Sequence, residues 1–132
     1  MGDVACVTTL SGMPAHSPEE THALLEAALN AHDADAFVAV YEPGATLVAP
    51  PAGDVVHGRD EIRRSLEPTF AANPRASIEV VRKLQSDGLA LTHAHWRISG
   101  TDLELEGHGS IVSRRQPDGT WLIVLDNPVS PH

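Results

Sequence analysis

Cysteine and basic residues are scarce in this 132-residue chain. Cys6 is the single cysteine, which excludes an internal disulfide and a zinc site built on cysteine ligands. Nine Lys and Arg stand against eighteen Asp and Glu, and the net charge of −9 disfavours nucleic acid and anionic membranes as partners. No apolar run approaches the roughly 20 residues of a membrane span. Because residues 1–14 lack Lys and Arg, they do not resemble a signal peptide, and we expect a cytoplasmic protein.

Motifs that hold cofactors or form covalent intermediates are missing as well. The chain has no Gly-rich phosphate loop, no nucleophile elbow and no Ser-His-Asp order with supporting spacing. We therefore expect no cofactor. What remains is a composition typical of a globular protein, with 42% hydrophobic and 20% charged residues, and a length that supports one hydrophobic core.

The N-terminal segment, residues 1–16, shows no periodic pattern, and we interpret it as a flexible arm. The remainder, residues 17–132, is expected to form a single domain. That domain opens with Ser17-Pro18, an N-cap followed by a first-turn proline, and Glu20 closes a capping box. Apolar residues at helical spacing then predict the first helix over residues 18–31.

The next elements are predicted from caps, breakers and apolar spacing. In order they are a helix capped by Asp33 and ended by Pro43-Gly44, a strand at 45–49, a loop at 50–58 and a helix at 59–72. Because Pro68 lies inside the last of these, we expect a kink or an early stop near Glu67.

The second half of the chain is predicted to be strands separated by tight turns. Alternating polar and apolar residues place them at 77–85, 89–99, 102–116 and 121–126. Three helices followed by such a meander indicate an α+β fold, with the helices packed on one face of a curved, mostly antiparallel sheet.

The central hairpin has a testable register. If Gly100-Thr101 is a two-residue loop, Ser99 lies opposite Asp102 and the two faces separate cleanly. One face then pairs Arg97 with Glu104, His95 with Glu106 and His93 with His108; the other pairs Ile98 with Leu103, Trp96 with Leu105, Ala94 with Gly107 and Thr92 with Gly109. The second face has almost no side-chain volume, so either a helix packs closely there or a hollow is left. Trp96 beside this gap is either a pocket wall or a core residue.

Several segments carry a family resemblance. They are Ala28 to Asp35 (ALNAHDAD), Phe37 to Tyr41 (FVAVY) with Ala45-Thr46, His57 to Arg63 (HGRDEIR), Arg114 to Trp121 (RRQPDGTW) and Asp126-Asn127-Pro128. Together they resemble the nuclear transport factor 2-like superfamily, in its SnoaL-like and ketosteroid-isomerase-like branch, over about residues 19–128. The resemblance implies a cone-shaped fold. It also implies a homodimer formed through the outer sheet face. This fold hosts enzymes, binding modules and assembly domains alike.

The resemblance also indicates which chemistry to expect. The positions that match the base and the two donors of steroid isomerases hold Ala49, Leu25 and Ile111, so we expect no steroid isomerase activity. SnoaL-type cyclases take an acid/base Asp from the later part of the sheet, and Asp126 is the acid that matches. The catalytic candidate is therefore Asp126.

Asp126 can be interpreted in two ways from the residues around it. Leu122, Val124 and Asp126 alternate on one face of the last strand, and the resemblance turns that face inward. An acid desolvated in this way has a raised pKa, as a general acid/base near neutral pH requires. Alternatively, Asp126-Asn127-Pro128 ends the strand and the carboxylate bonds to local backbone.

The remaining candidate site residues also have interpretations without a functional role. Tyr41 and Trp96 are predicted to line the cavity, and His57 and Asn127 to hydrogen-bond a ligand. The other interpretation of Tyr41 is a core aromatic residue, and that of His57 is an exposed loop residue. A cluster of His93, His95, His108 and Glu106 would suit Zn²⁺ or Ni²⁺. Its alternative is a polar or dimer-facing outer surface, and we expect no metal.

Two functions follow from these residues. The first is a protein that binds a small hydrophobic or carbonyl-bearing ligand in a pocket and acts on it as an isomerase or cyclase, through acid/base chemistry next to the carbonyl. The second is a non-catalytic homodimeric module for ligand binding or regulation. A closed cavity of about 300 Å³ or more with Asp126 facing into it favours the first, and an interior filled by side chains favours the second.

Overall fold

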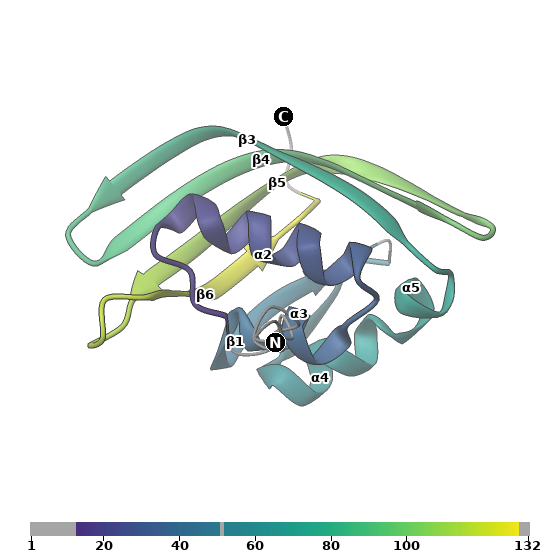
Figure 1. Cartoon of the computed structure of the whole chain (residues 1–132), viewed down its shortest axis with the longest axis horizontal. Helices are drawn as coiled ribbons and strands as arrows, with labels where there is room; N and C mark the ends of the chain where they lie inside the picture. Colours follow the sequence, from purple (N-terminus) through teal and green to yellow (C-terminus); the bar gives the residue numbers. More distant parts are fainter. Residues whose placement is uncertain (1–12, 51, 130–132) are drawn as a thin grey trace, which may run out of the picture.

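A computed structural model describes residues 13–50 and 52–129 of the chain. The described part is α+β, with helices packed on one face of a curved sheet, as predicted (Figure 1). Its elements are α2 (Pro18–Asn30), α3 (Ala34–Ala39), β1 (Tyr41–Ala49), β2 (Asp54–His57), α4 (Gly58–Ser65), α5 (Glu67–Ala71), β3 (Arg75–Ser86), β4 (Leu89–Gly100), β5 (Leu103–Arg115) and β6 (Trp121–Asn127).

The helices begin where their caps predict. The Ser17 hydroxyl accepts a hydrogen bond from the Glu20 N–H, and the Asp33 carboxylate accepts one from Ala36. The predicted third helix is two helices, because α4 ends one turn before Pro68 and α5 restarts with this proline in its first turn.

Two strand boundaries differ from the prediction. The second helix does not reach Pro43: it ends at Ala39, because Tyr41 already pairs with Ile123 of β6 and the Ile123 N–H donates to the Val40 carbonyl. The predicted loop at 50–58 contains β2, which folds back on β1 in antiparallel register. Gly53 supplies the positive φ of 88° that this reversal requires.

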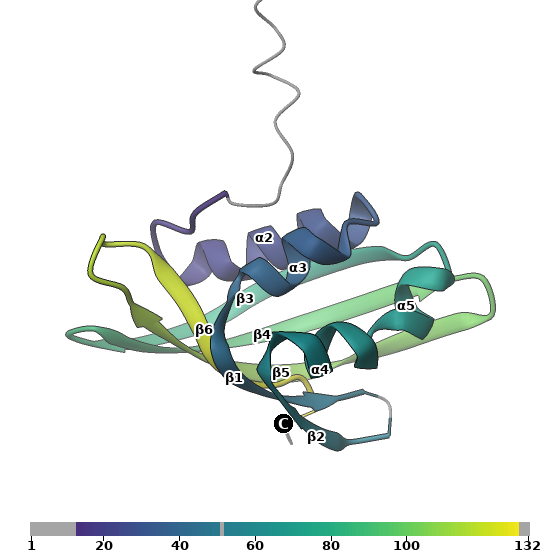
Figure 2. The ribbon, with the colours of Figure 1, turned by 90° about the horizontal axis from the view of Figure 1, so that it is seen from below.

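The six strands form one sheet in the order β2-β1-β6-β5-β4-β3. β1 and β6 run parallel, and the other neighbours are antiparallel. α2 lies across the concave face formed by the long strands, and α3, α4 and α5 flank its lower side (Figures 1 and 2). The main core fills the space between these two layers and includes Leu25, Leu29, Phe37, Tyr41, Ile62, Ile111 and Ile123.

The last residues of the predicted arm contact the sheet. Ala15 is 2% exposed and forms an isolated bridge with Trp121, whose N–H donates to the Ala15 carbonyl. Residues 1–12 of that arm lie outside the described residues.

The central hairpin has the predicted faces but not the predicted register. Gly100 pairs with Leu103, so the loop is Thr101-Asp102 and every partner on β5 lies two residues further along than predicted. A shift of two residues leaves each side chain on its face, since the side-chain period of a strand is two. Position 100 requires glycine in this register, because a Cβ there would collide with the carbonyl oxygen of Ala72, which accepts the Thr101 N–H.

Candidate functional site

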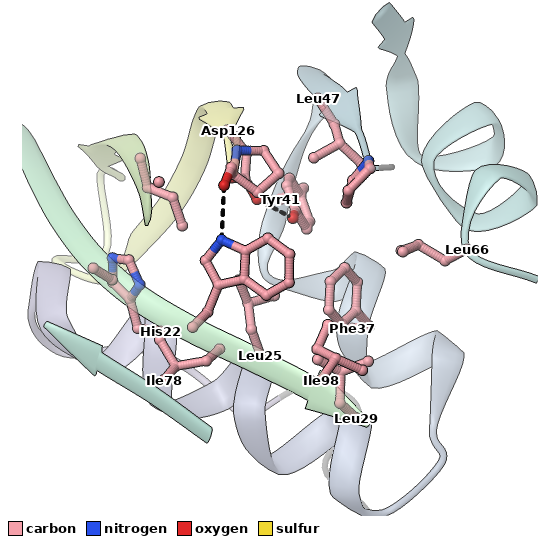
Figure 3. A pocket seen from close by; sticks show the side chains of 16 residues that line it. His22, Leu25, Leu29, Phe37, Tyr41, Leu47, Leu66, Ile78, Ile98 and Asp126 are labelled. Carbon is pink, nitrogen blue, oxygen red and sulfur yellow. Dashed lines mark hydrogen bonds between the residues drawn. The ribbon is translucent and has the colours of Figure 1, made fainter. Parts of the chain in front are cut away.

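A cavity of about 80 Å³ lies between α2 and the inner face of the sheet (Figure 3). Its wall is mostly aliphatic and aromatic, with Leu25, Phe37 and Trp96 among the contributors, and its titratable lining groups are His22, Tyr41 and Asp126. Its volume is below the roughly 300–1,000 Å³ of sites for drug-sized ligands. The cavity therefore suits a small molecule or the reacting end of a longer one.

A β-bulge in β6 directs Asp126 into this cavity. Ser113 of β5 pairs with Ile123 and Val112 pairs with Leu125, which leaves Val124 as the extra residue. Without a bulge, strict alternation from the buried Ile123 would turn Leu125 inward and Asp126 outward. The prediction that Leu122 and Val124 share the inward face with Asp126 was therefore wrong, although Asp126 itself is buried.

The Asp126 carboxyl is 8% exposed and accepts a hydrogen bond at Oδ2 from the Tyr41 hydroxyl, over 2.5 Å. Burial raises the pKa of Asp126 to about 6, and the bond from Tyr41 acts in the opposite direction. Burial, and after it the Asp126 charge, raises the pKa of Tyr41 well above its usual value. The pair therefore combines a carboxylate that is a competent base at neutral pH with a phenol that keeps its proton.

Tyr41 reaches this position because β1 begins directly after α3. Its side chain is fully buried, and its carbonyl accepts hydrogen bonds from both Nε and Nη2 of Arg59 in α4. Helix α4 is thereby tied to the start of β1. The structure places Tyr41 in the predicted cavity, in contact with the predicted acid.

Trp96 also lines the cavity, and its indole Nε1–H donates to the Pro128 carbonyl at 2.7 Å. The small residues on the inner face make room for the chain that follows β6. A Cβ on Gly109 would lie 2.6 Å from Pro128 Cα, and one on Gly107 would lie 3.1 Å from the Trp96 ring. The absence of side chains at Gly107 and Gly109 therefore makes room for the Asn127-Pro128 segment, rather than for a closely packed helix or an empty hollow.

Two predicted ligand-binding residues lie elsewhere. His57 is exposed before α4, where its Nδ1 is 2.9 Å from the Thr46 hydroxyl and its N–H donates to Glu61. Asn127 is exposed at the end of β6. Neither lines the cavity that holds Asp126. The role predicted for them has no geometric support from this pocket.

His22 is a cavity residue that the sequence reasoning missed. Its side chain is 4% exposed, and its Nε2 lies 2.6 Å from the hydroxyl of the fully buried Thr92. Burial lowers the pKa of His22 to about 4, which keeps the imidazole neutral at pH 7. The signal was available, because His22 is one turn before Leu25 on the buried stripe of α2.

The histidines of β4 and β5 lie on the opposite, outer face of the sheet. The His95 and His108 rings stack with their centroids 4.6 Å apart, and His93 Nδ1 is 3.1 Å from the Ser110 hydroxyl. Within the part of the chain that the structure describes, no group of three or more His, Cys, Asp or Glu side chains is placed to hold a metal ion. Over the same residues, no helix combines the length and apolarity needed to cross a bilayer.

The comparisons with known proteins agree with the fold. Residues 21–122 match the SnoaL-like domain family. A search of curated proteins gives no match. One similar solved structure comes from Shewanella oneidensis MR-1 and is described as a nuclear transport factor 2-like protein of unknown function. It has 18% identity and a TM-score of 0.71, over 85% of this chain and 95% of that one.

Two further solved structures share the fold. One, from Streptomyces avermitilis, is provisionally described as a dehydratase of the nuclear transport factor 2-like family, with 20% identity and a TM-score of 0.68 over 86% of this chain and 94% of that one. The other, from Thiobacillus denitrificans ATCC 25259, is provisionally described as an association domain of calcium/calmodulin-dependent protein kinase type II. It has 20% identity and a TM-score of 0.71, over 89% of this chain and 99% of that one.

Proposed function

The chain belongs to the SnoaL-like domain family, and from this premise we propose that it binds a small carbonyl compound and moves a proton next to the carbonyl group. The observation that carries the proposal is the Asp126 carboxyl, buried in the apolar cavity against the Tyr41 hydroxyl. The dehydratase description of the Streptomyces relative is compatible with such a reaction, because dehydration next to a carbonyl also begins with loss of a proton.

The step is a proton abstraction by Asp126. Because Tyr41 occupies Oδ2, the proton passes from the carbon beside the carbonyl to Oδ1. The C–H electron pair moves into the carbon–carbon bond, and the carbonyl oxygen becomes an enolate oxygen. Return of the proton to another carbon completes an isomerisation, whereas attack of the enolate on a second carbonyl completes a cyclisation.

The experiment follows proton exchange, which needs no knowledge of the natural product. The protein is incubated in D₂O with small ketones such as butan-2-one, and loss of the α-proton signals is followed by NMR. We expect Asp126→Asn to abolish the protein-catalysed exchange, and Asp102→Asn, an exposed Asp in the β4–β5 turn, to leave it unchanged. Equal exchange by wild type and Asp126→Asn would remove the proposed base.

A second candidate function is binding without catalysis. It is favoured by the small volume of the cavity and by the almost entirely apolar wall around Asp126. Binding alone predicts that apolar ligands without a carbonyl raise the melting temperature as much as ketones do. It also predicts the same increase in the Asp126→Asn variant.

We further propose a homodimer formed through the outer face of the sheet. The strand registers align one aliphatic residue from each of β3, β4, β5 and β6 in a single row across this face, namely Leu84, Leu91, Val112 and Leu125. Three of them are 38–56% exposed, and association would remove this apolar row from water. Sedimentation should show a dimer for wild type and a monomer for Leu91→Glu. The control Thr101→Glu, which adds the same charge at the hairpin loop, should remain dimeric.

A further inference from the structure

His22 and the Asp126–Tyr41 pair reach the same cavity from different layers of the fold. His22 comes from α2, whereas Asp126 and Tyr41 come from β6 and β1 (Figure 3). The Tyr41 hydroxyl already donates to Asp126, and the Trp96 indole N–H donates to the Pro128 carbonyl. These two donors are thus bound to protein acceptors, and His22 is the third side chain of the described cavity lining that can carry an N–H or O–H donor.

The His22 Nε2 contact with the Thr92 hydroxyl is compatible with a proton on either ring nitrogen. The Thr92 hydroxyl lies 2.6 Å from His22 Nε2 but 3.4 Å from the Ile111 carbonyl oxygen. A hydroxyl proton favours the shorter contact, since O–H hydrogen bonds weaken beyond about 3 Å. We assign the tautomer in which Thr92 donates to Nε2 and the neutral ring carries its own proton on Nδ1.

We propose that His22 is the hydrogen-bond donor, through Nδ1–H, to the carbonyl oxygen of the substrate that Asp126 enolises. This assignment rests on the proposed function and adds the group that the abstraction step lacks. As the C–H bond breaks and the proton passes to Asp126 Oδ1, negative charge accumulates on the carbonyl oxygen. A donor fixed in advance at that oxygen stabilises the transition state more than the ground state.

Burial keeps the His22 imidazole neutral, and a neutral ring suits the role of hydrogen-bond donor. A positive charge on an imidazolium in the same cavity would lower the pKa of Asp126 and weaken it as a base, whereas a neutral ring donates without that effect. The low pKa of His22, about 4, keeps the ring neutral throughout the range in which Asp126 is ionised. The Thr92 contact fixes the ring orientation, so little reorganisation accompanies the reaction.

The same lining defines the class of substrate. No Lys or Arg is among the described residues that line the cavity, and the ionised Asp126 repels a second negative charge. Carboxylates and phosphate esters would have no cationic partner at this wall. The substrate is therefore a small neutral ketone or aldehyde with an enolisable α-carbon.

Three substitutions at position 22 separate this role from a structural one. The amide nitrogen of Asn takes the place of histidine Nδ1 and that of Gln takes the place of Nε2, whereas Phe supplies neither. With butan-2-one in D₂O, we expect His22→Phe and His22→Gln to lower kcat for exchange by roughly 100- to 1,000-fold, with KM changed little. His22→Asn should stay within about tenfold of wild type. The anionic 4-oxopentanoate should exchange poorly with all four proteins.

The outcomes distinguish the two proposals. If Asp126→Asn abolishes exchange but His22→Phe retains wild-type kcat, or if Gln rescues and Asn does not, the role of His22 is wrong and the role of Asp126 stands. If wild type exchanges no ketone, the proposed chemistry fails. ¹⁵N NMR of labelled histidine then decides the donor: a shift of the His22 Nδ1–H signal on adding butan-2-one supports it, and no shift overturns it.

Discussion

The Tyr41 hydroxyl donates to the Asp126 carboxylate across 85 positions of sequence, and this bond joins the first residue of β1 to the end of the neighbouring parallel strand β6. It stabilises the charged form of an acid whose burial favours the neutral form. The Tyr41 hydroxyl thereby keeps the carboxylate available as a base at neutral pH.

Removing this hydroxyl should move the pH dependence of activity. In wild type, the rate of ketone proton exchange should rise with pH and level off above about pH 6, as Asp126 ionises. Tyr41→Phe removes the bond that lowers the pKa of Asp126, so the midpoint should move to higher pH. Exchange rates measured from pH 4 to pH 9 test this, and an unchanged midpoint would show that the bond does not tune the acid.

Asp126 should also affect stability in a pH-dependent way. Its pKa is raised from 3.8 to about 6, so between these values the folded protein holds a proton that the unfolded chain has released. Wild type should therefore lose stability relative to Asp126→Asn as pH rises through this window. At about 1.4 kcal/mol per pKa unit, the difference changes by roughly 3 kcal/mol. Urea unfolding of both proteins from pH 4 to pH 7 measures it, and a constant difference would contradict the raised pKa.

His22 should show the opposite dependence. Its pKa is lowered from 6.5 to about 4, so between these values the unfolded chain binds a proton that the folded protein does not. Wild type should lose roughly 3 kcal/mol relative to His22→Phe as pH falls from about 6.5 to 4. The same unfolding series measures this, and parallel curves for the two proteins would contradict the lowered pKa of His22.

Much of the fold was predictable because local signals agreed with the final structure. The Ser17 and Asp33 caps, the break near Pro68 and the small inner face of the central hairpin all follow from the sequence. The loop position was not predictable, because Gly100 is fixed by its contact with Ala72, a residue far away in the sequence.

The site was only partly predictable, for similar reasons. Asp126 was expected to face inward because it alternates with Val124 along the strand. In the structure a bulge at Val124 turns Asp126 inward instead. The location of a bulge depends on pairing with the neighbouring strands, which composition does not reveal. His22 was missed although it lies on the buried stripe of α2, because its partner, Thr92 of β4, is not identifiable from the sequence.

The segment after β6 packs closely against Gly109, and this packing should require the absence of a side chain at that position. An added methyl group there would lie 2.6 Å from Pro128 Cα, so Gly109→Ala must displace the segment that accepts the Trp96 N–H and lines the cavity. We expect a loss of roughly 1–3 kcal/mol in the free energy of unfolding. Gly44→Ala is the matched control, because a Cβ there meets nothing within 4 Å. Equal stability of the two variants would contradict close packing of this segment.

The central claim is that Asp126 is a buried carboxyl poised to act as a base near neutral pH. Its most direct test is a ¹³C NMR titration of the Asp side-chain carboxyl carbons, with the Asp126 signal assigned by its loss in Asp126→Asn. The structure predicts a midpoint at about pH 6 for this signal. A midpoint near the ordinary aspartate value of about 3.9 would contradict the account.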